Sequence, residues 1–124
     1  MRSRRRVKKG KVSTRTIRLN SLVLWIFWRA MLKKMMDEIE LLSRHIEVAK
    51  VVADYEPIGI MKLSELLDLP SHWIRYSLHV LEQLGYIRAS SEGAVATPRT
   101  VELFQHLNGG LDDLIQLLAA MKRP

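Results

Sequence analysis

Residues 62–90, KLSELLDLPSHWIRYSLHVLEQLGYIRAS, carry the local signals that decide the fold of this 124-residue chain. Ser64 is a suitable N-cap for a brief helix, and Ser71, after a proline-containing turn, is a suitable N-cap for a longer helix over residues 72–84. Gly85 follows in the position where helices commonly end with a left-handed residue. The stretch therefore predicts two helices joined by a tight turn.

Each of these helices, and a third one upstream, has one apolar side at helical spacing. In the brief helix we expect Leu63, Leu66 and Leu67 to point inward, and in the longer helix Ile74, Leu78, Leu81 and Leu84. The upstream helix is predicted over residues 37–54, with an apolar stripe at Ile39, Leu42, Ile46, Ala49 and Ala53. Three such helices can close one small core.

The residues after the longer helix change to an alternating pattern. Residues 86–90 and 94–97 alternate as strands do, and the Glu92–Gly93 pair between them suits a hairpin turn. Thr97 followed by Pro98 is a typical helix start. A β-hairpin followed by a further helix is therefore expected.

The last part of the chain is predicted to form two short helices. The first ends at Leu107, because Asn108, Gly109 and Gly110 are expected to break it, and the second covers residues 111–122. The second has a stripe at Leu111, Leu114, Leu118 and Met121 that the closed domain does not need. We expect this stripe to form a homodimer interface, although it could instead fold back onto its own domain.

The order of these elements, with S-E-L-L-x-L-P-S from Ser64 and L-x-x-L-G-Y-I from Leu81, resembles a winged helix-turn-helix domain. The resemblance covers residues 37–107, and small uncharacterised archaeal winged-helix proteins are the most similar. It implies a mainly α fold with a small β-hairpin (α+β) and an additional C-terminal helix. The expected division is an N-terminal extension at 1–35, the winged-helix domain at 36–107 and the C-terminal helix at 108–124.

The resemblance also implies a transcriptional regulator that places helix 72–84 in the major groove of double-stranded DNA and uses the hairpin as a wing. Arg75 would contact guanine, Ser71 and Tyr76 would contact phosphate, and the wing would follow the DNA backbone. The candidate DNA-binding residues are Ser71, His72, Trp73, Arg75, Tyr76, His79, Arg88, Ser90 and Ser91. Trp73 suits packing or a protein interface better than contact with bases, so a winged-helix protein–protein interaction module that does not bind DNA is the alternative.

The net charge of +7 is unevenly distributed along the chain. Residues 1–34 hold twelve basic side chains and no acidic one, whereas residues 35–124 hold eight basic and thirteen acidic side chains, a net charge of −5. The basic total therefore does not by itself indicate a DNA-binding domain.

The N-terminal extension has several interpretations. Residues 1–20 have no hydrophobic periodicity and are expected to be disordered, and residues 22–28 form a seven-residue apolar run that is too short to span a bilayer. The run could belong to a signal sequence or to a helix lying on a membrane, although membrane association is the less favoured expectation. Translation starting at Met31, Met35 or Met36, or a genuine basic arm, are the other possibilities.

Composition and spacing exclude several classes of site. The chain has no cysteine, and no two of its four histidines lie three or four residues apart, so neither a disulfide nor a helical metal site is expected. No phosphate-binding loop or nucleophile motif is present. We expect a cytoplasmic protein that is not an enzyme and needs no cofactor.

Overall fold

The computed structural model describes residues 21–124, which form two compact units, one up to Glu40 and the other from Leu41 to Pro124. Residues 1–20, and with them most of the expected extension, lie outside the described residues. Helix α2 (Ser21–Tyr55) belongs to both units, and the two units are treated separately below.

The first unit is described from Ser21 onward, as the N-terminal part of α2. The helix begins well before the expected residue 37, because nothing between Ser21 and Met36 is proline or glycine and the leucine and methionine residues there favour helix. Residues 21–35, the described part of the expected N-terminal extension, are therefore helical. Within residues 21–124, no helix is long and apolar enough to cross a membrane.

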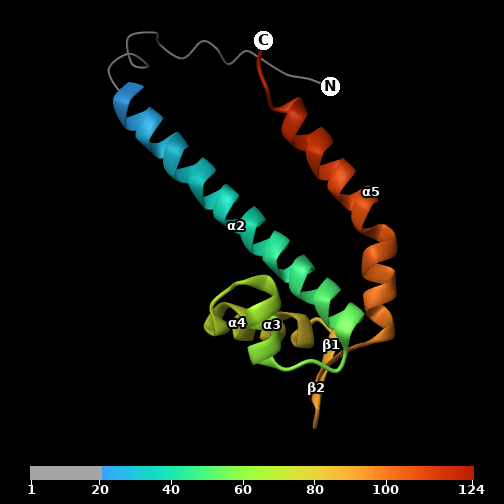
Figure 1. Cartoon of the computed structure of the whole chain (residues 1–124). Helices are drawn as coiled ribbons and strands as arrows, with labels where there is room; N and C mark the ends of the chain where they lie inside the picture. The colour runs from blue at the N-terminus through green and yellow to red at the C-terminus, as the bar shows by residue number, and fades with distance from the viewer. Residues whose placement is uncertain (1–20) are drawn as a thin grey trace. The chain divides into compact units, whose positions relative to one another are not determined.

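The second unit has the expected mainly α architecture with one hairpin. The end of α2 is followed by α3 (Ile60–Leu67), α4 (Ser71–Gln83), β1 (Ile87–Ser90), β2 (Gly93–Ala96) and α5 (Pro98–Ala120) (Figure 1). The two strands form one antiparallel sheet, in which Ile87 pairs with Ala96 and Ser90 with Gly93. This is a winged helix-turn-helix fold, as predicted, with α3 and α4 as the helix pair and β1–β2 as the wing.

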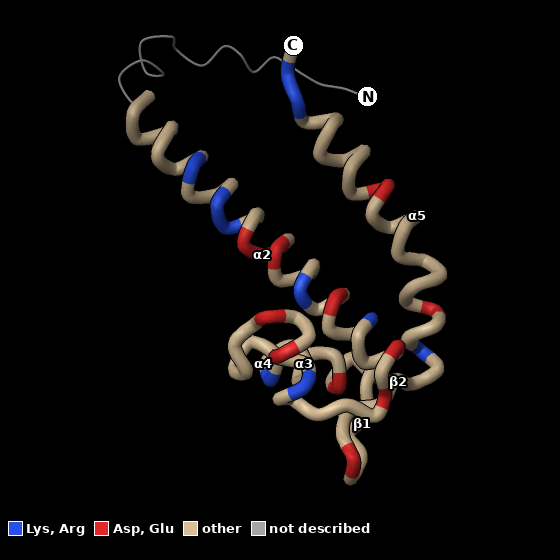
Figure 2. The backbone as a smooth tube through the Cα atoms, in the orientation of Figure 1, with Lys and Arg blue, Asp and Glu red and all other residues tan. Residues whose placement is uncertain are grey.

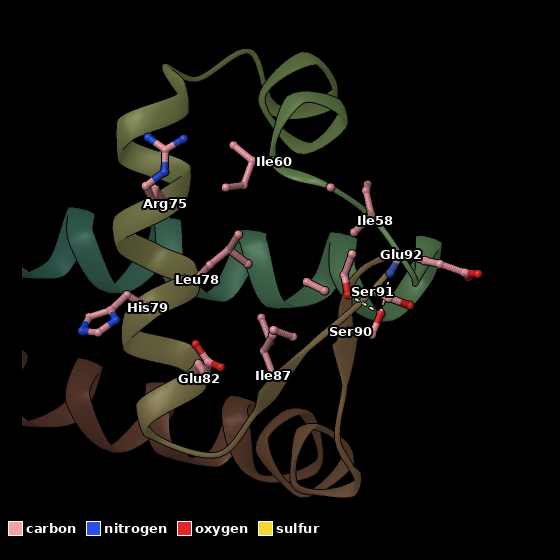
Figure 3. Close-up of a pocket in the computed structure, with 14 residues that line it drawn as sticks. Ile58, Ile60, Arg75, Leu78, His79, Glu82, Ile87, Ser90, Ser91 and Glu92 are labelled. Atoms are coloured by element: carbon pink, nitrogen blue, oxygen red, sulfur yellow. Dashed lines mark hydrogen bonds between the residues drawn. The ribbon is translucent and has the colours of Figure 1, made fainter.

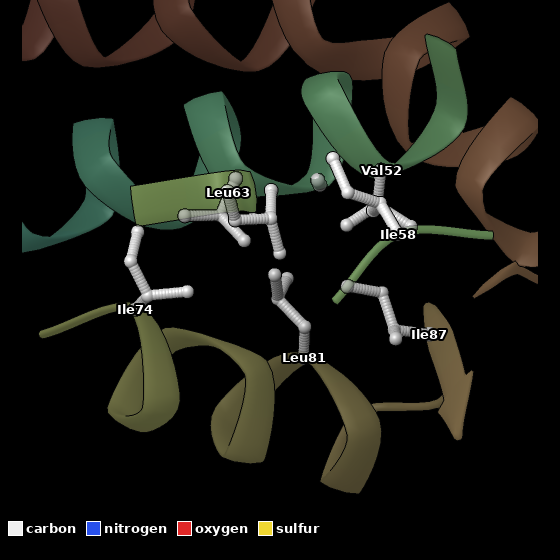
Figure 4. Packing of buried hydrophobic residues seen from close by; sticks show 8 residues of the cluster. Val52, Ile58, Leu63, Ile74, Leu81 and Ile87 are labelled. Carbon is white, nitrogen blue, oxygen red and sulfur yellow. The ribbon is translucent and has the colours of Figure 1, made fainter. Parts of the chain in front are cut away.

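The core lies where α2, α3, α4 and the hairpin meet. Figure 4 shows side chains from all four, and Ile58 from the link before α3, converging; the others are Val52, Leu63, Ile74, Leu81 and Ile87. Leu63 and Ile74 are fully buried, as expected, but Leu66 and Leu84 are exposed. Leu84 lies just beyond α4, which ends at Gln83, and is its C-cap.

The core-facing residues of α2 differ from the expected stripe. Val48, Ala49 and Val52 are buried, whereas Ile39 and Leu42 are 40% and 42% exposed. Ala49 belongs to the expected stripe, whereas Val48 and Val52 do not. The buried residues of α2 lie near its C-terminal end, where they join the core of the second unit.

The ends of α4 confirm one prediction and correct another. Gly85 is left-handed at φ +87°, and the amides of Gly85 and Tyr86 donate to the carbonyls of Glu82 and Leu81, which together form a Schellman motif. At the other end Pro70 is the N-cap, and Ser71 is the first helical residue. The sequence had suggested Ser71 as the N-cap, and this prediction is therefore wrong.

The expected cap of α3 is also wrong. Ser64 lies inside the helix, where its hydroxyl donates to the carbonyl of Leu69 across the following turn. Gly59 is the N-cap instead, without a side-chain cap hydrogen bond. Ser64 therefore stabilises the turn between the two helices rather than the start of the first.

The wing is attached to the chain that precedes α3. Ile58 forms an antiparallel bridge with Ala94, in which the amide of each residue donates to the carbonyl of the other, at 3.1 and 2.8 Å. Gly93 permits this approach, because its φ is +133° and a Cβ there would lie 2.6 Å from the Ile58 carbonyl. The hairpin therefore has a third, one-residue partner close to its turn.

Helix α5 is continuous through Asn108–Gly110, where two helices had been predicted. Glycine lowers helix stability by about 1 kcal/mol relative to alanine but does not prevent helix, and no proline follows it there. The partly buried Leu103 and Phe104 pack against the core and hold the first half of the helix in place. The additional C-terminal helix is thus a continuation of the helix after the wing.

Candidate nucleic-acid interface

Helix α4 has two sides that carry predicted site residues, and the first contacts α2. The Arg44 guanidinium lies 4.5 Å from the centre of the Trp73 ring, and the His45 and Tyr76 rings are 5.8 Å apart. Below them, Nδ1 of His45 and the hydroxyl of the fully buried Ser77 form a 2.8 Å hydrogen bond. Trp73 and Tyr76 are therefore fixed by α2, although they remain 43% and 51% exposed.

The electrostatics of this side follow from partial burial. Burial lowers the pKa of His45 from its ordinary value of 6.5, and the neighbouring Arg44 charge lowers it further. Nε of Arg44 is buried and has no hydrogen-bond partner among the described residues. The Trp73 ring compensates part of that cost through its attraction for the guanidinium.

The second side of α4 faces the wing across a cavity of about 580 Å³. Arg75, His79 and Glu82 line it from the helix, and Ser90, Ser91 and Glu92 line it from the hairpin (Figure 3). Its apolar part is formed by Ile58, Ile60, Leu78 and Ile87. In Figure 3 the His79 side chain points away from the hairpin.

The arginines of α4 and β1 differ in their ion pairing from lysines of α2 and α3. Arg75 and Arg88 are exposed, and no ion pair within residues 21–124 involves either of them. By contrast, Lys50 and Lys62 pair with acidic residues on their own helices, at 3.2 and 3.4 Å. Two cations on α4 and the wing are therefore available to a ligand.

The structure thus divides the predicted DNA-binding residues between the two sides of α4. Four of them line the cavity, namely Arg75, His79, Ser90 and Ser91. Trp73 and Tyr76 lie on the α2 side instead. The other three, Ser71, His72 and Arg88, neither line the cavity nor take part in these ring contacts with α2. Ser71 is half-buried, and His72 and Arg88 are exposed.

Sequence reasoning missed two features of this region. Glu82 and Glu92 line the same cavity as Arg75, and they oppose the attraction of a phosphate backbone. The position of Glu82 follows from its seven-residue separation from Arg75, which places both on one side of a helix. The contacts of Arg44 and His45 join residues about thirty positions apart, and no local pattern indicates them.

No group of three or more histidine, aspartate or glutamate residues within the described part of the chain could hold a metal ion. The geometry is that of the winged helix-turn-helix class, with a hairpin beside a helix that exposes His72, Trp73, Arg75 and Tyr76.

No protein-family model matches the chain, and no curated protein matches its sequence. Among solved structures, Staphylococcus aureus MarR in complex with salicylate and kanamycin is similar, at 14% identity and a TM-score of 0.47 over 83% of this chain and 80% of that one. The activation domain of the phage T4 transcription factor MotA has 17% identity and a TM-score of 0.46 over 58% of this chain and 79% of that one. Similarities this low assign no family, and the archaeal part of the resemblance finds no support in them.

Proposed function

We propose that this protein is a sequence-specific, DNA-binding transcriptional regulator that inserts α4 into the major groove and places β1–β2 against the backbone as a wing. The observation that carries the proposal is the pair of exposed arginines, Arg75 on α4 and Arg88 on β1, that have no ion-pair partner within residues 21–124. Cations of this kind would both position a helix on DNA and read it.

Each predicted residue has a role in this proposal. Arg75 would donate to the O6 and N7 atoms of guanine, the commonest specific contact in the major groove. No side-chain hydrogen bond caps the N-terminus of α4, so the first amides and the Ser71 hydroxyl can donate to a phosphate. His72, Tyr76 and His79 would extend the contacts along the helix.

The wing and a second subunit complete the proposed complex. Arg88, Ser90 and Ser91 would contact the sugar–phosphate backbone, because all three are exposed on one strand and its turn. The C-terminal half of α5 would pair two subunits, so that two α4 helices read half-sites about one helical turn, or 34–36 Å, apart. The proposed interface comprises Leu111, Leu114, Leu118 and Met121, of which the last two are exposed. A cytoplasmic location belongs to the same proposal.

The test is a comparison of specific and nonspecific binding, because the basic residues 1–34 will hold the full chain on any DNA at low salt. Fluorescence anisotropy with a fragment from the protein's own promoter region, in the presence of scrambled competitor, isolates the specific component. We expect Arg75→Ala to weaken specific binding by about 1–3 kcal/mol. Arg123→Ala is the matched control, since it removes the same exposed side chain near the C-terminus.

Equal specific binding by Arg75→Ala and the control would remove Arg75 from the interface. Absence of any preference for the promoter fragment in the wild-type chain would contradict the proposed function itself.

The alternative is a protein–protein interaction module, and one observation favours it. Trp73 and Tyr76 remain about half exposed while Arg44 and His45 hold their rings in place, and preorganised aromatic side chains of this kind are typical of protein interfaces. Under this alternative the full chain shows no DNA preference, and Trp73→Ala removes a partner that Arg75→Ala retains.

A further inference from the structure

Helix α4 by itself offers little positive charge to DNA. Its thirteen residues include one basic side chain, Arg75, and one acidic side chain, Glu82. Basic residues also lie on α2, and those of its part in the second unit are Arg44 and Lys50 (Figure 2). Lys50 is ion-paired with Asp54 at 3.2 Å, whereas no hydrogen bond or ion pair within the described part of the chain involves Arg44. Arg44 is therefore a cation that the domain leaves unpaired.

The Arg44 side chain is nevertheless held in place against α4. Its guanidinium lies 4.5 Å from the centre of the Trp73 ring, and the next residue, His45, is bonded to the buried Ser77 of α4 at 2.8 Å. Among the described residues, Nε of Arg44 is the one side-chain atom that is both buried and unpartnered, so its two Nη atoms reach solvent. A ligand of these Nη atoms meets a preorganised cation.

Arg44 and Arg75 lie at the two edges of the outward side of α4. Arg75 lines the cavity beside the wing, and Trp73 holds Arg44 at the edge that contacts α2. Two residues along a helix correspond to a rotation of about 200°, so Trp73 and Arg75 point to nearly opposite sides, with the exposed His72 and Tyr76 between them. A helix in the major groove has a sugar–phosphate backbone along each side, one from each strand. The two cations match that arrangement.

We propose that Arg44 binds a phosphate of the DNA strand opposite to the one that the wing follows, with the Tyr76 hydroxyl as a second donor to the same backbone. The inference rests on the proposed function, because α4 must first lie in the major groove. The guanidinium and the phenol hydroxyl both donate hydrogen bonds, which phosphate oxygens accept. Arg44 on one strand and Arg88 on the other then fix the register of Arg75 on the bases.

An acidic protein surface is the other partner that an unpaired guanidinium suits. The placement of the cations favours DNA, because Arg44 and Arg75 occupy both edges of one exposed helix side. A groove of DNA has phosphates at each edge, whereas a single acidic patch on a protein is matched by cations that cluster together.

The test measures how DNA affinity depends on salt in the full chain. Arg44→Gln removes the charge, and Lys50→Gln is the matched control, since it removes one charge from another side of the same helix that Asp54 already neutralises. Loss of one phosphate contact reduces the slope of log K against log salt by about 0.9. The affinity of Arg44→Gln relative to the wild type should therefore rise about 3.5-fold between about 50 and 200 mM salt, and that of Lys50→Gln should stay constant.

Two further readouts separate a phosphate contact from a structural role. Arg44→Gln should weaken binding to the promoter fragment and to scrambled DNA by the same factor, whereas Arg75→Ala should lose the preference between them. Arg44→Lys, which keeps the charge, should retain the wild-type salt dependence. In ethylation interference, the phosphates that Arg44→Gln no longer senses should lie across the major groove from those that Arg88→Gln no longer senses.

Three results overturn the inference, and far-UV circular dichroism first confirms that each variant is folded. A wild-type chain without preference for the promoter fragment overturns it together with the proposed function. If the wild type has that preference, equal salt dependence of Arg44→Gln and Lys50→Gln overturns this inference alone and leaves Arg44 to a protein interface. Loss of the contact in Arg44→Lys as well would show that Arg44 only holds Trp73 in place.

Discussion

Replacement of Leu63 by alanine tests whether the core described above is what holds the domain together. Leu63 is fully buried in α3, at the centre of side chains from α2, α4 and the hairpin (Figure 4). Leucine-to-alanine substitutions at buried sites cost about 2.7–5 kcal/mol, and a site surrounded on all sides lies in the upper part of that range, since little can move in to fill the cavity. A loss of about 3–5 kcal/mol is a large part of the total of about 5–15 kcal/mol that stabilises a typical domain.

Leu66 provides a matched control. It lies three residues further along the same helix and is 41% exposed, so alanine there removes the same atoms and brings the same helix propensity. We expect Leu66→Ala to change the free energy of unfolding by less than about 1 kcal/mol. Urea denaturation of both variants in the full chain, followed by circular dichroism, measures the difference.

For a domain of this size, about 3 kcal/mol corresponds to a decrease of roughly 12–24 °C in Tm. Equal destabilisation by the two substitutions would refute the assignment of α3's buried side. A decrease below about 1 kcal/mol for Leu63→Ala would show that the core can close over the cavity.

Two further predictions concern the wing and the α2–α4 contact. Gly93→Ala should destabilise the domain by about 2–5 kcal/mol in the same urea assay, because its Cβ would overlap the Ile58 carbonyl and its φ is +133°. Gly59→Ala, with nothing within 4 Å of its Cβ, should leave stability within about 1 kcal/mol of the wild type. A reversed order would contradict the contact between Ile58 and the wing. His45 should make the domain less stable in acid. Its pKa in the folded protein lies below 6.5, so the unfolded chain binds the proton first; the contribution is complete above pH 6.5 and decreases as the pH falls below that value. Unfolding free energies measured from pH 7.5 to 5 should show this slope, and His45→Gln, which retains a partner for Ser77, should reduce it; an unchanged slope would assign the effect to other groups.

Local patterns predicted the helix-turn-helix and wing well, because short-range chemistry decides those elements. The left-handed Gly85 and the hairpin after it depend on residues only a few positions apart, and both were predicted. The extent of the long helices was not. Helix α2 extends back to Ser21 because no proline interrupts it there. Helix α5 continues through Gly109 because no proline follows and its first half is packed against the core. The few residues around an apparent helix break do not reveal such packing.

The candidate site was predicted only in part, for a related reason. Helical spacing places Arg75 and His79 on one side of α4, and both line the cavity. Trp73 and Tyr76 lie on the other side, where α2 contacts them, and the helical period alone does not reveal which outward residues a distant helix will cover. Partners about thirty positions away in the sequence settle that question.

The bridge between Ile58 and Ala94 has a consequence for the order in which this domain folds. The two strands of the wing are neighbours in sequence and can pair early, but the bridge closes a loop that contains all of α3 and α4. Closing a loop of that length has an entropic cost, and the packing of the helix pair provides the free energy that offsets it. The hairpin should therefore form as a local structure and acquire its fixed direction last, when the helices beneath it are already in place.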